Sequence, residues 1–333
     1  MSYQNTEPKI TVITGYYNRA HALEHTIDSI LQQTFTDFEL IVFNDNSTDN
    51  TETLLEQLID KYNDPRLIVI NHPENKGFVQ GMIDAIKIAK GEYICVQGSG
   101  DYSYPERLEL QSTLLDNETD VGAVGCFYEN YVEDRNIIRE RKKEITDLSF
   151  NELMKGNVFS HGEVMFRKTT YEAVGGYRPE FINCQDYDLW LRIIKIAKLA
   201  SVPNVLYKRY IRYDGVSYKP SKFLKQTRYF YLCKLLAQLS DKEQIEILNK
   251  LNAVGLENLV TLNSFNAQKM IVNACLRFVV WEEFDAAKTL TQEGINNKLV
   301  RGCLYLFIHI YKSKLANPFR SFINYKLGIN VEK

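Results

Sequence analysis

The feature that most constrains the fold is a regular alternation of two hydrophobic patterns over the first 131 residues. Short apolar, β-branched runs typical of buried strands recur between longer stretches with apolar residues at helical spacing. Strands are predicted at 9–14, 38–45, 66–71, 92–97 and 121–131, and helices at 20–33, 49–62, 78–90 and 105–116. Such alternation indicates an α/β fold with a mainly parallel sheet and helices on both faces. Ser103 and Glu106 have the spacing of a capping box for the last of these helices.

The pattern changes toward the C-terminus. Residues 132–220 are less regular, with several short strands and one helix expected at 185–198. After residue 220 the strand signals end and helical patterns follow. We therefore predict an α/β domain over residues 1–220 and an α-helical module over residues 221–333. Residues 275–295 faintly resemble a pair of repeat helices, but the repeat is not sustained.

Composition and charge narrow the classes of protein. The formal net charge is −2, so no global basic footprint indicates binding to nucleic acid. The six cysteines have no CxxC spacing and stand in apolar stretches, which predicts buried reduced thiols. No secretory signal pattern is seen, and no apolar run is long enough to cross a bilayer. These features predict a cytoplasmic location.

Polar and turn-forming residues follow three of the predicted strands. They occupy positions 14–18, 44–47 and 98–101. The carboxyl ends of parallel strands meet at one edge of a sheet, and ligands bind there in open α/β folds. The sequence therefore predicts a binding site at this edge.

Three segments resemble a known enzyme family in both order and spacing. Residues 10–51, 75–109 and 160–192 are similar to the family 2 (GT-A fold) inverting glycosyltransferases. The resemblance implies a nucleotide-diphospho-sugar transferase-like sheet and the transfer of a sugar to a hydroxyl of a glycan or lipid-linked acceptor, in surface polysaccharide biosynthesis. The QxxRW motif of processive synthases is absent, which favours addition of a single sugar. A uridine diphosphate sugar is the favoured donor.

The segment QDYDLWLR, residues 185–192, carries the predicted catalytic residue. The resemblance places the general base at Asp186. Inverting transfer needs the acceptor hydroxyl to lose its proton as it attacks, and a carboxylate base is typically worth ~10²–10⁴ in rate. Asp188 is expected to brace the start of the helix, where acidic residues are favoured. For His161 and Trp190 two roles stay open: contact with the donor or acceptor, or support from behind the site.

The resemblance also implies nucleotide contacts. Asp45 is expected to hold the base of the nucleotide, and the alternative is that it caps the next helix. Tyr17 follows the first strand and either packs on the nucleotide or has a structural role. Further predicted contacts are Gly15, Lys76, Ser99, Gly100 and Asp101.

The stretch QGSGDYSYP, residues 97–105, departs from the family. In the family this frame encloses an acidic cluster that holds Mn²⁺ or Mg²⁺ against the diphosphate of the donor. Here the positions of those acids are Gly98 and Gly100, and only Asp101 remains. One hypothesis is that Asp101 alone still carries a metal, because Mg²⁺ often uses one or two carboxylates together with phosphate oxygens.

Two further hypotheses follow from the same stretch. In the second, the glycine-rich backbone turns its N–H groups toward the phosphates, and Lys76 or Arg19 supplies positive charge without a metal. The helix predicted near Pro105 would add its positive end. In the third, the domain is a non-catalytic nucleotide-sugar-binding or scaffold protein. Retention of Asp186 argues against the third hypothesis.

The C-terminal module is rich in basic residues around apolar stretches. A basic amphipathic surface can rest on anionic lipid, which would place the protein at the inner face of the membrane. The alternative is a packed helical bundle with solvated lysines. The residues concerned are Lys298, Arg301, Lys312, Lys314, Arg320 and Lys326.

Overall fold

A computed structural model describes residues 7–133, 136–211, 219–313 and 316–326. The chain forms two compact units. The first runs up to Tyr131 and from Ile138 to Tyr210, and the second joins Val132–Ile137 to the chain from Ile211 onward. A compact unit need not fold on its own. The division into domains at residue 220 therefore stays a prediction.

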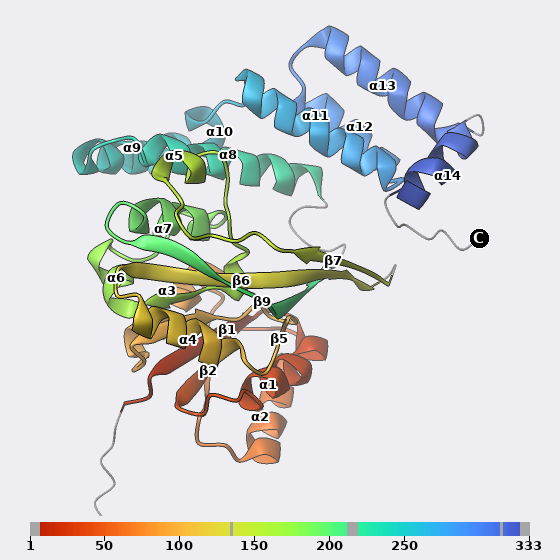
Figure 1. The fold of residues 1–333 in the computed structure, drawn as a ribbon. Coiled ribbons are helices and arrows are strands. Elements are labelled where there is room, and N and C mark those ends of the chain that lie inside the picture. Colours follow the sequence, from red (N-terminus) through yellow and green to blue (C-terminus); the bar gives the residue numbers. More distant parts are fainter. Residues whose placement is uncertain (1–6, 134–135, 212–218, 314–315, 327–333) are drawn as a thin grey trace, which may run out of the picture. The chain divides into compact units, whose positions relative to one another are not determined.

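A mixed sheet organises the first unit (Figure 1). Its strands are β1 (Ile10–Tyr16), β2 (Phe38–Asn44), β3 (Leu67–Asn71), β4 (Tyr93–Val96), β5 (Tyr102–Ser103), β6 (Val121–Val132), β7 (Ile137–Arg141), β8 (Met165–Arg167) and β9 (Lys198–Ile211). Their order is β3-β2-β1-β4-β8-β6-β9-β5, and β7 pairs with β6. β1 pairs in parallel with both β2 and β4, and β2 with β3. The predicted α/β fold with a mainly parallel N-terminal sheet is confirmed.

One strand interrupts the parallel order. β8 pairs antiparallel with both β4 and β6. β6 therefore runs in the same direction as β4 without being its neighbour. The sequence pattern marked residues 121–131 as a strand but not β8, because three residues are too few to show a period.

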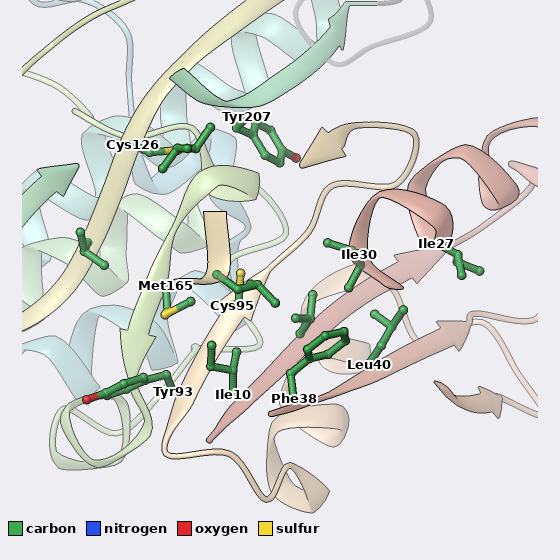
Figure 2. Close-up of a cluster of buried hydrophobic side chains, with 14 of the residues drawn as sticks. Ile10, Ile27, Ile30, Phe38, Leu40, Tyr93, Cys95, Cys126, Met165 and Tyr207 are labelled. Atoms are coloured by element: carbon green, nitrogen blue, oxygen red, sulfur yellow. The ribbon is translucent and has the colours of Figure 1, made fainter. Parts of the chain in front are cut away.

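Helices cover both faces of the sheet. They are α1 (Leu23–Leu31), α2 (Thr51–Tyr62), α3 (Phe78–Ile88), α4 (Arg107–Asn117), α5 (Phe150–Leu153), α6 (Lys168–Ala173) and α7 (Gln185–Ile193). Alternate residues of β1 and β2, such as Val12 and Leu40, pack with α1, α2 and α4 in one buried cluster, part of which Figure 2 shows. Phe43 of β2 points the other way, toward α3, where a Cβ on Gly81 would lie 2.3 Å from its ring. The period of two along each strand thus assigns each helix to one face.

The predicted capping box at Ser103 and Glu106 is wrong. α4 begins at Arg107, and neither side chain caps it. The hydroxyl of Ser103 instead donates to Gln97 Oε1 at 2.7 Å and accepts from Arg107 Nη1 at 2.8 Å. The cause is the Arg107 guanidinium, which is 0% exposed and also donates to Gln111 Oε1 and a backbone carbonyl. A buried charge must be fully hydrogen-bonded, so Ser103 is turned inward.

The second unit is helical, as predicted. It contains α8 (Pro220–Leu236), α9 (Asp241–Val254), α10 (Leu256–Leu259), α11 (Phe265–Val280), α12 (Phe284–Gly294), α13 (Lys298–Lys312) and α14 (Asn317–Lys326). α11 and α12, which contain the repeat-like stretch, lie side by side (Figure 1). Their core includes Ile271, Leu290 and Ile308. Within the described ranges, no helix is both long and apolar enough to span a membrane.

The cysteine prediction is confirmed in part. None of the six cysteines forms a disulfide, and four of them are buried. Cys184 is partly exposed, and Cys303 is exposed on α13.

Candidate active site

The three polar loops meet at the carboxyl edge of the sheet, as the sequence predicts. Asn18 follows β1, and its Oδ1 accepts from the backbone N–H of Thr48 at 2.7 Å. Arg19 Nη1 donates to the carbonyl of Ser99, in the loop after β4, at 3.1 Å. The ends of β1, β2 and β4 are therefore joined by side chain to backbone hydrogen bonds.

Asp45 holds a loop in place. It is 3% exposed, and its Oδ1 accepts from the N–H of Lys76 at 2.9 Å and lies 3.0 Å from His72 Nδ1. Its Oδ2 accepts from the N–H of Gly77 at 2.9 Å. The capping alternative is wrong, because α2 begins at Thr51 and its first turn bonds to Asp49. Contact between Asp45 and a nucleotide base stays a prediction.

The other predicted nucleotide contacts differ in their exposure and in their partners within the protein. Tyr17 is 50% exposed, so its ring offers a surface on which a base could stack. Gly15 is buried, and a Cβ there would lie 2.1 Å from the Phe43 ring, so packing explains its small size. The Lys76 ammonium pairs with Asp84 of α3 at 3.1 Å. The roles of these residues toward a nucleotide stay predictions.

Asp101 is folded back against β9. Its Oδ2 accepts from the Tyr207 hydroxyl at 2.6 Å and its Oδ1 from the N–H of Tyr210 at 2.9 Å. Tyr207 is fully buried, in the cluster of Figure 2, and its oxygen also accepts from the N–H of Gly98 at 3.0 Å. Burial raises the pKa of Asp101, against the hydrogen bonds from Tyr207 and Tyr210 and the positive charges of Arg209 and Arg19. Both oxygens of the carboxylate are thus occupied within the protein.

The two glycines of the loop are explained by close packing. A Cβ on Gly98 would lie 2.3 Å from Asp101 Oδ2 and 2.8 Å from the Tyr207 oxygen, so no acidic side chain fits there. Gly100 has a φ of +91°, a left-handed conformation that glycine adopts without strain. Its N–H donates to Thr26 Oγ1 at 3.0 Å. Because the N–H groups of Gly98 and Gly100 are both in use, the hypothesis that they cradle the phosphates is wrong for these two donors.

The residues of this loop do not fit a divalent cation. Mg²⁺ and Mn²⁺ require oxygen ligands with unshared lone pairs directed at one point. Asp101 directs its oxygens at Tyr207 and Tyr210 instead, and the position of Gly98 has no room for a second acid. In the part of the chain that the structure describes, no three His, Cys, Asp or Glu side chains gather as metal ligands.

Asp186 is presented differently. It is the second residue of α7 and partly exposed. Its Oδ2 accepts from Asn157 Nδ2 at 2.8 Å, and no described residue donates to its Oδ1. The residue before the helix, Cys184, has a φ of +59°, a sharp turn that sets where α7 starts. One oxygen is therefore held in place and the other is available to a substrate.

Asp188 and Trp190 support the helix from inside. Asp188 is 3% exposed and pairs with Arg178 at 3.1 Å and Arg192 at 2.6 Å, which confirms the predicted bracing role. Trp190 is 0% exposed and packs edge-on against Phe159 with ring centroids 5.9 Å apart. Of the two roles left open for Trp190, this geometry favours support from behind the site.

His161 lies on a short turn before β8. Its Nε2 is 2.7 Å from the Tyr177 hydroxyl, and its ring meets Phe78 edge-on at 5.7 Å. Burial lowers the pKa of His161, against a smaller opposing effect of the Asp186 charge. The imidazole is therefore neutral at neutral pH and suited to a positioning role. Contact with donor or acceptor stays a prediction.

Comparison with known proteins identifies the family. The model of glycosyl transferase family 2 matches residues 11–175. The putative glycosyltransferase EpsE of Bacillus subtilis is 32% identical over 226 residues, which span 66% of this chain and 78% of EpsE. The chain belongs to glycosyl transferase family 2. A hyaluronan synthase of Pasteurella multocida is 27% identical, but the match covers 68% of this chain and only 23% of that synthase.

Solved structures agree with the family 2 fold. Residues 1–349 of TarS from S. aureus match 97% of this chain and 93% of theirs, with a TM-score of 0.55 and 20% identity. The mannosyltransferase PcManGT of Pyrobaculum calidifontis, solved with GDP-Man and Mn²⁺, covers 98% of this chain and 86% of its own, with a TM-score of 0.58 and 17% identity. The predicted GT-A fold is confirmed.

Three residues at the candidate site of this family 2 enzyme were not predicted from the sequence. Asn157 orients Asp186, Tyr207 holds Asp101, and Arg209 lies on the same face of β9 as Tyr207. All three belong to the stretch that reads as irregular. The run Tyr-Lys-Arg-Tyr at 207–210, two basic residues between two tyrosines, is the signal that could have drawn attention to Tyr207 and Arg209.

Proposed function

We propose that this family 2 glycosyltransferase transfers a single sugar, with inversion, from a nucleotide-diphosphate sugar to a hydroxyl of a glycan or lipid-linked acceptor. The observation that carries the proposal is the state of the Asp186 carboxylate. One oxygen is fixed by Asn157, the other accepts no hydrogen bond from a described residue, and the group is partly exposed. A general base needs this combination of orientation and access.

The reaction follows from that geometry. The acceptor hydroxyl oxygen attacks the anomeric carbon of the donor from the face opposite the diphosphate. Oδ1 of Asp186 takes the hydroxyl proton as the new carbon–oxygen bond forms. The bond between the anomeric carbon and the diphosphate oxygen breaks with its electron pair, and the nucleoside diphosphate leaves. The Asn157 amide keeps the carboxylate aimed during the transfer.

The donor is proposed to lie along the carboxyl ends of β1, β2 and β4. Tyr17 offers the exposed ring nearest to the end of β1, and Asp45 fixes the loop that closes this edge. TarS has been solved with UDP-GlcNAc and PcManGT with GDP-Man. These ligands support a nucleotide-diphosphate sugar here, and a uridine diphosphate sugar is the donor that we propose to test first.

Names of relatives support the acceptor class. A hyaluronan synthase and a chondroitin synthase of Pasteurella multocida align with about two thirds of this chain. Both names denote enzymes that build polysaccharides from sugars. We therefore place the proposed reaction in polysaccharide biosynthesis, with a sugar hydroxyl as acceptor.

Turnover of nucleotide sugars tests the proposal. The full chain is incubated with a panel of nucleotide-diphosphate sugars, and release of nucleoside diphosphate is measured with and without oligosaccharide acceptors. We expect turnover of at least one donor and, by NMR, a product whose anomeric configuration is opposite to that of the donor. Binding of donors with no turnover under any condition would instead favour a non-catalytic binding protein.

A membrane contact through the second unit is also proposed. α13 leaves Leu299, Leu306 and Ile310 exposed at 81%, 61% and 52%, and their spacing places them along one side of the helix. Residues 294–331 contain no Asp or Glu. Lys298 is exposed beside this apolar stripe, whereas Lys314 lies outside the described residues. An apolar stripe with surrounding positive charge suits an anionic lipid surface.

Co-sedimentation with vesicles tests this contact. We expect the full chain to pellet with vesicles that contain phosphatidylserine and to stay in the supernatant with neutral phosphatidylcholine vesicles. Charge substitution of the stripe, Leu306→Glu with Ile310→Glu, is expected to abolish pelleting. Equal pelleting of the variant and the wild type would contradict the proposal.

A further inference from the structure

Arg209 is a cation with no partner among the described residues, and it stands beside the loop that departs from the family. It lies near the end of β9, partly exposed, on the face that carries Tyr207. Its neighbour Tyr210 donates its N–H to Asp101, so Arg209 is at the level of the loop. The guanidinium makes no hydrogen bond or ion pair with any residue in the described ranges. An arginine that no described residue holds, at the predicted ligand-binding edge of the sheet, requires an explanation.

The charge of Arg209 acts on two nearby acids, Asp101 and Glu163, but forms an ion pair with neither of them. Asp101 is held by Tyr207 and the N–H of Tyr210, with no ion pair to an arginine. Glu163 is 1% exposed, and burial raises the pKa of its carboxyl well above the ordinary value. Since no described acid pairs with Arg209, its guanidinium donors stay available to a ligand.

Arg19 reaches the same loop from the other side. Its Nη1 donates to the Ser99 carbonyl at 3.1 Å, and its other N–H groups have no acceptor among the described residues. The Arg19 charge acts on Asp101, as that of Arg209 does. Two guanidinium groups therefore act on the loop in which the family carries its metal-binding acids.

We propose that Arg209, together with Arg19, binds the diphosphate of the nucleotide sugar and supplies the positive charge that a divalent cation provides in the family. Guanidinium groups match phosphate oxygens with two parallel hydrogen bonds and keep their charge at any physiological pH. As the bond to the anomeric carbon breaks, negative charge builds on the diphosphate, and fixed cations stabilise that charge. The catalytic role of the two arginines rests on the proposed sugar transfer. Their binding of a diphosphate does not depend on it.

Calorimetric titration separates this proposal from metal binding. The probes are UDP and GDP, each compared with its monophosphate, in excess EDTA and then with MnCl₂. We expect at least one of the two diphosphates to bind, with the same affinity in EDTA as with Mn²⁺. Arg209→Ala is expected to weaken diphosphate binding about 10- to 100-fold, as for loss of hydrogen bonds to a charged group. Binding of the monophosphate is expected to change much less.

Lys208→Ala is the matched control. Lys208 directly precedes Arg209 on β9, and its replacement by Ala removes the same charge. The Lys208 ammonium lies on the opposite face, 4.6 Å from the centroid of the Tyr131 ring. We expect this variant to bind as the wild type does. Arg209→Lys, which keeps the charge and loses the paired donors, is expected to lie between the wild type and Arg209→Ala. Thermal unfolding of each variant confirms that it is folded.

Three results would overturn the inference. One is diphosphate binding that requires Mn²⁺, a second is equal binding by Arg209→Ala and Lys208→Ala, and a third is no diphosphate binding by the wild type. Failure of the proposed transfer is distinguishable, because binding is measured without turnover. Turnover that depends on a metal would contradict this inference and support the proposed transfer. Diphosphate binding that depends on Arg209, without turnover, would support this inference and contradict the transfer.

Discussion

Replacing Asp186 by Asn is expected to lower the rate of sugar transfer ~10²–10⁴-fold, the usual contribution of a general base. The amide is nearly the same size as the carboxylate but cannot take up the acceptor proton. Asp186 is partly exposed, and its carboxylate accepts one hydrogen bond from the described residues, from Asn157 Nδ2 at 2.8 Å. Donor binding and stability should therefore change little, and the loss should appear in kcat rather than in KM.

The measurement is initial-rate kinetics with the donor found by the turnover screen, together with thermal unfolding. Asn157→Ala provides a graded comparison, because it leaves the carboxylate but removes the amide that aims it. Its kcat is expected to fall less than that of Asp186→Asn. Turnover by Asp186→Asn at the wild-type rate would show that another group takes the proton.

The acid two residues further on is expected to matter for stability and not for chemistry. Asp188→Ala should lower the free energy of unfolding by about 3–5 kcal/mol, the range seen when one partner of a buried ion pair is removed. Asp188 is 3% exposed, and its side chain faces Arg178 and Arg192, which are 18% and 10% exposed. Its loss removes the buried carboxylate that both guanidinium groups share.

Urea denaturation followed by circular dichroism measures this effect. Asp120→Ala is the control, because Asp120 also pairs with a basic residue, Lys198 at 2.7 Å, but both side chains are more than half exposed. Solvent screens such pairs, and we expect no measurable change. If Asp188→Ala unfolds at the same denaturant concentration as Asp120→Ala, the buried cluster contributes little to stability.

Asp186 and Asp188 show which features of the site can be predicted from the sequence. Asp186 and Asp188 stand in one short motif, so resemblance and first-turn chemistry were enough to assign them different roles. Tyr207 lies 106 positions after Asp101, and no local pattern connects them. The pairing depends on β9 lying beside the loop, which is a property of the sheet and not of either segment. Asn157 escaped for the same reason, since it lies 29 positions before Asp186.

The fold shows the same division between local and distant causes. Apart from the two-residue strand β5, the strands and helices up to residue 131 follow from periodicity, because each is long enough to repeat its pattern. β8 has three residues and exists because β4 and β6 flank it on both sides. The helix expected at 185–198 ends at Ile193, and residues from Lys198 onward enter β9 instead. Long-range pairing outweighs local propensity there.

The space that Tyr207 occupies also bears on how such a loop could change over generations. Its oxygen lies where a Cβ on Gly98 would come within 2.8 Å, and a Cβ on Gly162 within 2.2 Å. An acidic residue introduced at position 98 would meet Tyr207 and the carboxylate of Asp101 at once. An acidic cluster at this place would therefore require a smaller side chain at 207 and a reoriented Asp101 together. An acid gained at position 98 alone is therefore unfavourable, and the packing of the loop itself opposes that change.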